Sequence, residues 1–130
     1  MSSPVILISD DEPLVVSALA REARRSGLTC ITDTTSENVL ELARQHRPAV
    51  IILDIYQRLD GRDLLVQLKQ DPATRDCKVI ILSGIEDQHM RHQCFQLGAH
   101  AYEVKPFNAT FIPRVARLAA ANAQSPRAQG

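Results

Sequence analysis

The sequence predicts a single α/β domain in which five parallel strands form a doubly wound sheet covered by helices on both faces. The first observation is the alternation of short aliphatic runs with longer amphipathic segments, repeated five times. The second is that three of these runs are continuously apolar, as expected of strands buried on both sides. The third is a length of 130 residues with 45% hydrophobic residues, which suits one core.

Each predicted strand is a short aliphatic or β-branched run bounded by polar or turn-forming residues. Strands that follow one another through helices lie parallel, with right-handed crossovers. The predicted strands are Val5–Ser9, Thr29–Thr32, Val50–Leu53, Val79–Leu82 and Ala101–Val104.

The helices are predicted from apolar residues at helical spacing and from the residues that begin or end each segment. Gly27 and Gly98 are placed as C-terminal caps, and Thr34 with Glu37 three positions later forms a possible capping box. Pro113 lies inside the last helix and predicts a late start or a bend. The predicted helices are Leu14–Ser26, Ser36–His46, Arg62–Gln70, Glu86–Leu97 and Ala109–Ala121.

Composition limits the classes of partner. The 15 basic and 15 acidic residues balance, which argues against nucleic acid or an anionic membrane as an obligate partner. No apolar run is long enough to cross a bilayer and no secretory signal pattern is present, so a cytoplasmic protein is expected. The cysteines Cys30, Cys77 and Cys94 form no paired motif and are interpreted as small apolar side chains. Residues 1–120 are predicted to form the domain and 121–130 a flexible tail or the start of a linker.

Polar side chains follow four of the predicted strands at their carboxyl ends, where open parallel sheets bind ligands. Clustered carboxylates attract Mg²⁺, and a carboxylate beside such an ion can attack a phosphoryl group. A lysine can neutralise charge on the transferring group, and a hydroxyl can donate to one of its oxygens. These side chains are Asp10, Asp11, Asp54, Ser83 and Lys105.

Simpler explanations exist for each residue alone. One acidic residue before a helix is stabilised by the helix dipole, which is our interpretation of Glu12, but two directly after a buried strand favour a metal site. Ser83 alone would be a helix cap, and Asp60 is interpreted as the cap of the helix that begins at Arg62. An aromatic residue in an edge strand, such as Tyr102, is often packing.

Four motifs, "ISDDEP", "IILD", "ILSG" and "GAHAYEVKPF", resemble those of the receiver domain of two-component response regulators, of the chemotaxis-regulator-like kind. The resemblance covers about the first 120 residues. It implies a flavodoxin-like fold with strand order 2-1-3-4-5 and a cis Lys105–Pro106 bond. It also implies a bacterial signalling protein that accepts a phosphoryl group on Asp54 from a histidine kinase or phosphotransfer protein.

The resemblance further assigns roles to the individual site residues. Asp10, Asp11 and Asp54 would hold Mg²⁺ together with the backbone carbonyl of Tyr56. Ser83 and Lys105 would contact the phosphoryl oxygens. Tyr102 would be the aromatic switch residue, which turns inward when Ser83 moves toward the phosphate.

Phosphorylation would then change a surface formed by the Glu86 helix, the last strand and the Ala109 helix, which would bind a partner or a second copy. The domain would be regulatory rather than an enzyme with its own turnover. Two alternatives remain: a pseudo-receiver that binds without phosphorylation, and a phosphatase with an aspartyl nucleophile. Against the second, Tyr56 stands where such a phosphatase carries another aspartate.

The segment from Asp54 to Gly61 departs from the family pattern because it lacks the usual proline and is one residue short. Tyr56 is also bulky at a position that shapes the access of hydrolytic water. The sequence therefore predicts a long-lived phosphorylated form.

Overall fold

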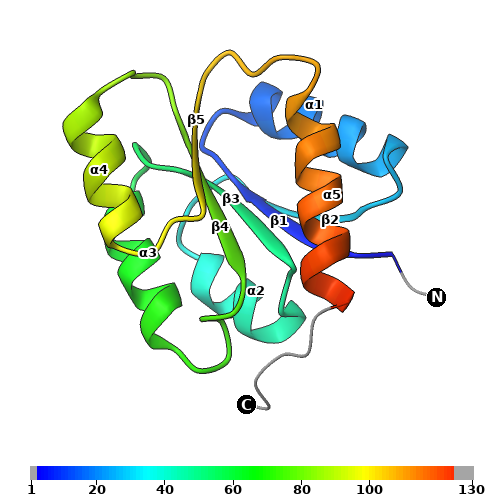
Figure 1. The fold of residues 1–130 in the computed structure, drawn as a ribbon, viewed down its shortest axis with the longest axis horizontal. Helices are drawn as coiled ribbons and strands as arrows, with labels where there is room; N and C mark the ends of the chain where they lie inside the picture. The colour runs from blue at the N-terminus through cyan, green and yellow to red at the C-terminus, as the bar shows by residue number, and fades with distance from the viewer. Residues whose placement is uncertain (1–2, 125–130) are drawn as a thin grey trace.

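The fold is that of a three-layer α/β domain, seen in a computed structural model that describes residues 3–124 (Figure 1). The strands are β1 (Val5–Ser9), β2 (Thr29–Asp33), β3 (Val50–Asp54), β4 (Lys78–Ser83) and β5 (Ala101–Val104). The helices are α1 (Pro13–Arg25), α2 (Val39–His46), α3 (Gly61–Gln70), α4 (Gln88–Gln96) and α5 (Phe111–Gln124). Within the described residues, no helix is both long and apolar enough to cross a membrane.

The sheet is parallel throughout and has the order β2-β1-β3-β4-β5, as predicted. Alternate residues of the central strands point to opposite faces, so the sheet has two separate cores. On one face Ile6, Ile8 and Ile52 pack with residues of α1 and α5. On the other face Leu7 and Ile51 pack with residues of α2, α3 and α4. The central strands are therefore buried on both sides, which explains their continuous apolar runs.

The predicted start of α2 at Ser36 is wrong, because the helix begins at Val39. Ser36 has a φ of 62°, a left-handed conformation that cannot continue into a helix. The predicted capping box is also wrong. Asp33 organises this turn instead, since its carboxylate accepts hydrogen bonds from the backbone N–H groups of Thr35 and Asn38.

The other helix boundaries agree with the prediction to within three residues. α4 begins at Gln88 rather than Glu86, because the Asp87 side chain caps it by accepting hydrogen bonds from two backbone N–H groups. α5 begins late, at Phe111, which is one of the two outcomes predicted from Pro113. The proline therefore lies in the first turn of the helix, where a backbone N–H is not needed. It ends at Gln124, so the predicted tail lies outside the described residues from position 125 onward.

Gly61 begins α3 where the backbone passes close to the end of β3. A Cβ atom on Gly61 would lie 2.6 Å from Ile55 Cα and 2.9 Å from the Asp54 carbonyl oxygen. The Gly61 N–H also donates to the Ile55 carbonyl at 2.9 Å. This close approach closes the short β3–α3 loop. The Asp60 carboxylate caps α3 by accepting from the Arg62 N–H, which confirms that prediction.

We expect Gly61→Ala to lower the free energy of unfolding by about 1 to 2 kcal/mol, because the added methyl group would clash with backbone atoms that cannot move independently. Gly84→Ala is the matched control, since a Cβ at Gly84 meets nothing within 4 Å. Urea denaturation of both variants measures the difference. Equal stability of the two variants would contradict the close packing of this loop.

Candidate functional site

The structure brings three aspartate side chains together at the carboxyl edge of the sheet. Asp10 follows β1 and Asp54 ends β3, and these strands are hydrogen-bonded neighbours. One carboxylate oxygen from each of Asp10, Asp11 and Asp54 lies within 4.8 Å of the others. Asp10 and Asp54 are only 1% and 4% exposed, whereas Asp11 is exposed. The cluster is thus buried on its protein side and open to solvent on the other.

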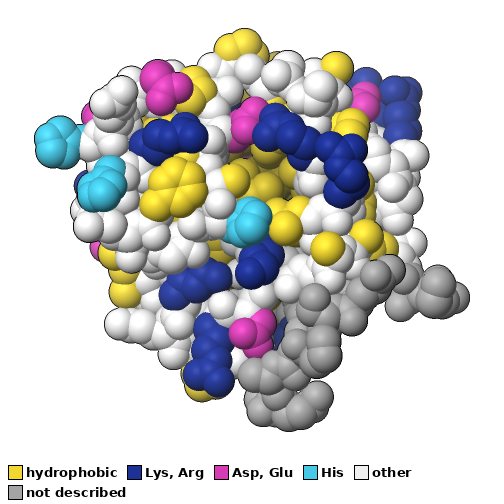
Figure 2. Space-filling model, in the orientation of Figure 1, with side chains coloured by type: hydrophobic (Ala, Val, Ile, Leu, Met, Phe, Trp, Pro, Cys, Tyr) yellow, Lys and Arg dark blue, Asp and Glu magenta, His cyan; other side chains and the backbone are white. Residues whose placement is uncertain are grey.

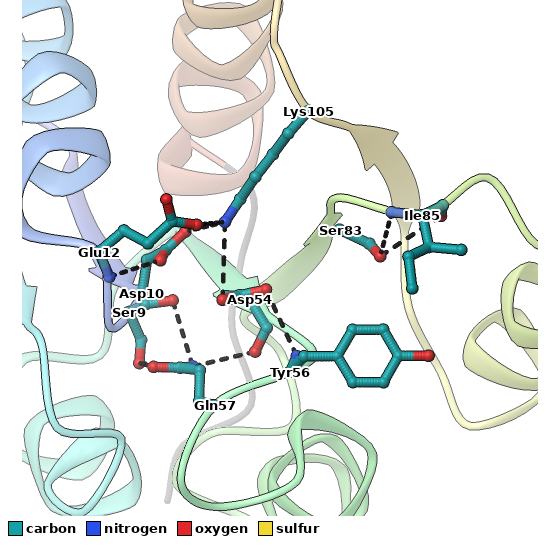
Figure 3. Close-up of polar contacts among 9 residues, drawn as sticks. All are labelled: Ser9, Asp10, Glu12, Asp54, Tyr56, Gln57, Ser83, Ile85 and Lys105. Carbon is teal, nitrogen blue, oxygen red and sulfur yellow. Dashed lines mark hydrogen bonds and ion pairs between the residues drawn. The ribbon is translucent and has the colours of Figure 1, made fainter.

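The Lys105 side chain reaches this cluster from the end of β5 (Figure 3). Its Nζ lies 2.8 Å from Asp10 Oδ2, 2.8 Å from Glu12 Oε1 and 3.6 Å from Asp54 Oδ2. Glu12 accepts a hydrogen bond here, so its role is larger than the helix-terminal one inferred from the sequence. One cation therefore partly balances several carboxylates.

Burial raises the pKa of Asp54 from its ordinary value of 3.8 to about 7, and the Asp10 carboxylate adds to this effect. Lys105 and the backbone N–H of Tyr56 act in the opposite direction. Burial is also the largest influence on Lys105 and lowers its pKa, but the carboxylates of Asp10, Glu12 and Asp54 outweigh it and leave that pKa raised. Without further positive charge, Asp54 is therefore only partly ionised near neutral pH.

The oxygen atoms of this cluster suit a small, hard cation. Asp10 Oδ2 is buried and accepts no hydrogen bond from the described part of the chain. Its contact with Lys105 Nζ is an ion pair at 2.8 Å that does not have hydrogen-bond geometry. A buried carboxylate oxygen in this state can take a further cationic partner. Carboxylate oxygens are typical ligands of Mg²⁺, so Asp10, Asp11 and Asp54 fit such an ion.

Tyr56 lies next to Asp54 but directs its ring away from the acidic cluster (Figure 3). Its backbone N–H donates to Asp54 Oδ1 at 3.4 Å, and the residue is 48% exposed. The backbone pairs with Asp60 in an isolated antiparallel bridge. The loop therefore brings a backbone donor, rather than the phenol, to the carboxylate of Asp54.

Ser83 and Tyr102 meet at the loop after β4 rather than at the acidic cluster. The Ser83 hydroxyl accepts from the Ile85 N–H at 3.1 Å and donates to the Ile85 carbonyl at 3.4 Å. The Tyr102 hydroxyl donates to the same carbonyl at 2.9 Å. Tyr102 is only 5% exposed, and the guanidinium carbon of Arg91 lies 5.7 Å from the centre of its ring. Both side chains therefore share one backbone partner.

The order of the elements, the strand order and the edge on which these groups converge agree with a known family. A sequence profile described as "Response regulator receiver domain" matches residues 6–117. The chain belongs to the response regulator receiver family.

Relatives of this receiver domain include longer regulators. It is 32% identical over 104 residues to the alkaline phosphatase synthesis transcriptional regulatory protein PhoP of Bacillus subtilis, a match covering 79% of this chain and 42% of PhoP. It is 34% identical over 118 residues to the transcriptional regulatory protein KdpE of Mycobacterium tuberculosis, covering 90% of this chain and 50% of KdpE. The receiver domain thus spans half or less of these relatives.

Solved structures agree with the receiver fold. A putative response regulator from Chloroflexus aurantiacus superposes with a TM-score of 0.83 at 26% identity, covering 92% of this chain and 99% of that one. A CheY-like receiver domain protein from Methanospirillum hungatei has a TM-score of 0.85 at 19% identity, covering 95% and 98% of the two chains. The second likeness shows the fold alone.

The sequence did not indicate two residues, Gln57 and Ser9, that lie directly beside the acidic cluster. Gln57 bonds to Ser9 and to the Asp54 carbonyl, although neither Gln57 nor Ser9 stands out as a motif. The position of Gln57 inside the shortened loop was the one available signal. Ser9, in contrast, is an ordinary strand end in the sequence. Its contact with Gln57 is visible only in the folded structure, where Ser9 is buried.

Proposed function

We propose that this receiver domain is a phosphorylation switch with Asp54 as the phosphoacceptor. The observation that carries the proposal is the meeting of Asp54 with Asp10, Asp11 and Lys105 at one edge of the sheet. The phosphoryl donor would be a phosphohistidine on a histidine kinase or phosphotransfer protein, as family membership suggests. The chain would act in the bacterial cytoplasm.

In the transfer step, an ionised Asp54 oxygen attacks phosphorus while the N–P bond of the phosphohistidine breaks and the imidazole leaves with the bonding electrons. Lys105 Nζ, which is 3.6 Å from Asp54 Oδ2, would stabilise charge on one phosphoryl oxygen. The Ser83 hydroxyl would donate to another after leaving its partner in the β4–α4 loop. The Tyr56 backbone N–H already faces the carboxylate and is a third donor.

The groups that would hold Mg²⁺ are the carboxylates of Asp10, Asp11 and Asp54 and the backbone carbonyl of Tyr56. When bound, the ion would supply positive charge that reduces repulsion among these carboxylates and the phosphoryl oxygens. The raised pKa of Asp54 is a reason for such positive charge, because the carboxylate must be ionised to react.

The link from Asp54 to the surface would run through Ile85. If Ser83 turns toward a phosphoryl group, it releases the backbone N–H and carbonyl of Ile85. That carbonyl also accepts from Tyr102, so the loop and Tyr102 would move together. α4 follows this loop and buries only Cys94 among its side chains, which makes it a weakly held element suited to a shift.

The responding surface would comprise α4, β5 and α5. Figure 2 shows this side of the molecule, with a hollow between β5 and α5 that has an apolar floor and charged side chains at its rim. The groove measures about 210 Å³, and its lining includes Ile80, Leu118 and the ion-paired Glu103 and Arg114. Such a mixed surface suits a protein partner or a second copy of this chain. The balanced charge of the chain does not favour nucleic acid or an anionic membrane in this role.

The domain would assist only its own phosphorylation and dephosphorylation. The two other candidates, a pseudo-receiver and a phosphatase-like enzyme, lack comparable support. The acidic cluster argues against the first, and Tyr56, where a second acidic group would be required, argues against the second.

Intact-mass measurement tests the proposal directly. With Mg²⁺ and a small phosphodonor such as acetyl phosphate, the wild-type protein should gain one phosphoryl group, labile to hydroxylamine, and Asp54→Ala should gain none. Asp63→Ala, an exposed aspartate of α3, is the control and should behave as wild type. A wild-type protein that gains no phosphate would favour a pseudo-receiver, and phosphate uptake by Asp54→Ala would place the acceptor elsewhere.

Replacing Tyr56 with asparagine should shorten the lifetime of the phosphorylated form by about tenfold, because the amide side chain can orient a hydrolytic water beside Asp54, which the outward-pointing phenol does not do. A phosphate-release assay on the phosphorylated proteins measures the rate. Leu59→Asn makes a similar change at another exposed apolar residue of the loop and should leave the rate unchanged. Equal or slower loss in Tyr56→Asn would refute the hypothesis.

A further inference from the structure

The β3–α3 loop is held in place by polar contacts. Residues 55–60 contain no proline to restrict the backbone. On one side of the loop, the Leu59 N–H donates to the hydroxyl of the buried Ser36 at 3.0 Å. At its base, the Gly61 N–H donates to the Ile55 carbonyl at 2.9 Å. On the other side, the Gln57 side chain reaches the carboxyl ends of β1 and β3.

The Gln57 amide contacts the carboxyl ends of both strands. Its Nε2 donates to the Asp54 carbonyl at 2.9 Å and lies 3.3 Å from the Ser9 carbonyl and 3.1 Å from Ser9 Oγ. Its Oε1 accepts from Ser9 Oγ at 3.3 Å. The carbonyl oxygens of Ser9 and Asp54 both face this end of the side chain, and only the NH₂ group of the amide can donate to them. The orientation of the side chain is therefore determined by its surroundings.

These contacts flank the acidic cluster directly. Ser9 precedes Asp10, and it is fully buried in β1. The Asp54 carbonyl belongs to the proposed phosphoacceptor itself, and Gln57 follows Tyr56, whose N–H faces the Asp54 carboxylate. Figure 3 shows the amide between Ser9 and Asp54, below the carboxylates that Lys105 contacts. One side chain thus connects the two backbone segments that carry Asp10 and Asp54.

We infer that Gln57 is a positioning residue, which sets the spacing of the Asp10 and Asp54 carboxylates and the placement of the Tyr56 backbone. The inference rests on the proposed function for its consequence in phosphoryl transfer, but its structural part concerns the metal-free chain alone. The hydrogen bonds of Gln57 restrict the backbone of this short loop, which has no proline to restrict it. A hydrogen-bonded side chain behind a set of metal ligands commonly affects metal affinity by about tenfold or more.

Two substitutions separate hydrogen bonding from space filling. Gln57→Met keeps the length of the side chain and removes its donors, whereas Gln57→Asn keeps the amide but shortens its reach. The control is Gln67→Met, which changes an exposed glutamine of α3. Both Gln57 variants should bind Mg²⁺ about tenfold more weakly in a calorimetric titration and take up phosphate correspondingly more slowly. Affinity equal to wild type in Gln57→Met would overturn the inference.

A second readout does not depend on metal or phosphate. In the metal-free protein, the Leu59 and Gly61 amides should exchange hydrogen about tenfold faster in Gln57→Met than in wild type. Unchanged exchange would overturn the inference even if the wild-type protein takes up phosphate normally. Conversely, a wild-type protein without phosphate uptake would overturn the proposed function, while faster exchange in the variant would still support Gln57 as the anchor of the loop. If Gln57→Met fails to fold, Gln57→Asn decides by the same measurement.

Discussion

Replacing Lys105 with methionine should lower the free energy of unfolding of the metal-free protein by about 3 kcal/mol at neutral pH. Lys105 Nζ lies 2.8 Å from both Asp10 and Glu12 and 3.6 Å from Asp54. Methionine fills a similar space but leaves the buried Asp10 and Asp54 without their cation. The contacts also raise the pKa of Lys105. Its stabilising effect is therefore present across the neutral range and is lost only as the pH rises above the ordinary pKa of lysine.

The same variant should take up phosphate about 100-fold more slowly, because it lacks the cation proposed to stabilise the phosphoryl oxygens. Urea denaturation and intact-mass kinetics measure the two effects, and saturating Mg²⁺ should recover part of the lost stability. Lys78→Met is the matched control, at the opposite end of the sheet. Equal losses in both variants would show that Lys105 contributes only as an ordinary lysine.

Replacing Asp54 with asparagine should stabilise the metal-free protein, and the gain should increase with pH. The pKa of Asp54 is about 7 in the folded protein against an ordinary 3.8. Between these values the folded state binds more protons than the unfolded state, so the wild-type protein loses stability as pH rises from about 4 to 7. Asparagine carries no titrating group and removes this loss.

The full pKa difference would correspond to about 4 kcal/mol, but the open side of the cluster screens the charges and reduces the expected gain to about 2 kcal/mol at about pH 8. Denaturation measured across this pH range in the presence of a chelator tests the prediction. Asp63→Asn, on exposed α3, should show no such pH-dependent gain. A wild-type protein whose stability rises over the same range would contradict the electrostatic description of the site.

These two predictions have opposite signs although both remove a charge from one cluster. The cluster contains more acidic than basic groups, so removing the cation increases repulsion and removing an anion relieves it. A site built for stability would place the charges in balance. The excess of negative charge instead supports the proposal that a cation completes this cluster.

Local patterns in the sequence were sufficient for most of the fold. Continuous apolar runs predicted β1, β3 and β4 because strands covered on both faces have no polar side. The start of α2 was not predictable in this way. Ser36 was assigned to a helix by pattern, but its buried hydroxyl contacts Leu59 of another loop and its backbone is left-handed. A contact between distant segments overrode the local preference there.

By itself, the sequence determined that Asp10, Asp11, Asp54 and Lys105 follow strands of one parallel sheet, and hence that they occupy one edge. Only the tertiary structure decided that Lys105 also pairs with Glu12, 93 residues away, and that Gln57 bonds to Ser9 across 48 residues. The physical reason is that local periodicity and chain connectivity determine the strands and their parallel direction, which brings their carboxyl ends to one edge. The partner of a charged or polar side chain depends on where distant loops come to lie once the two cores are packed.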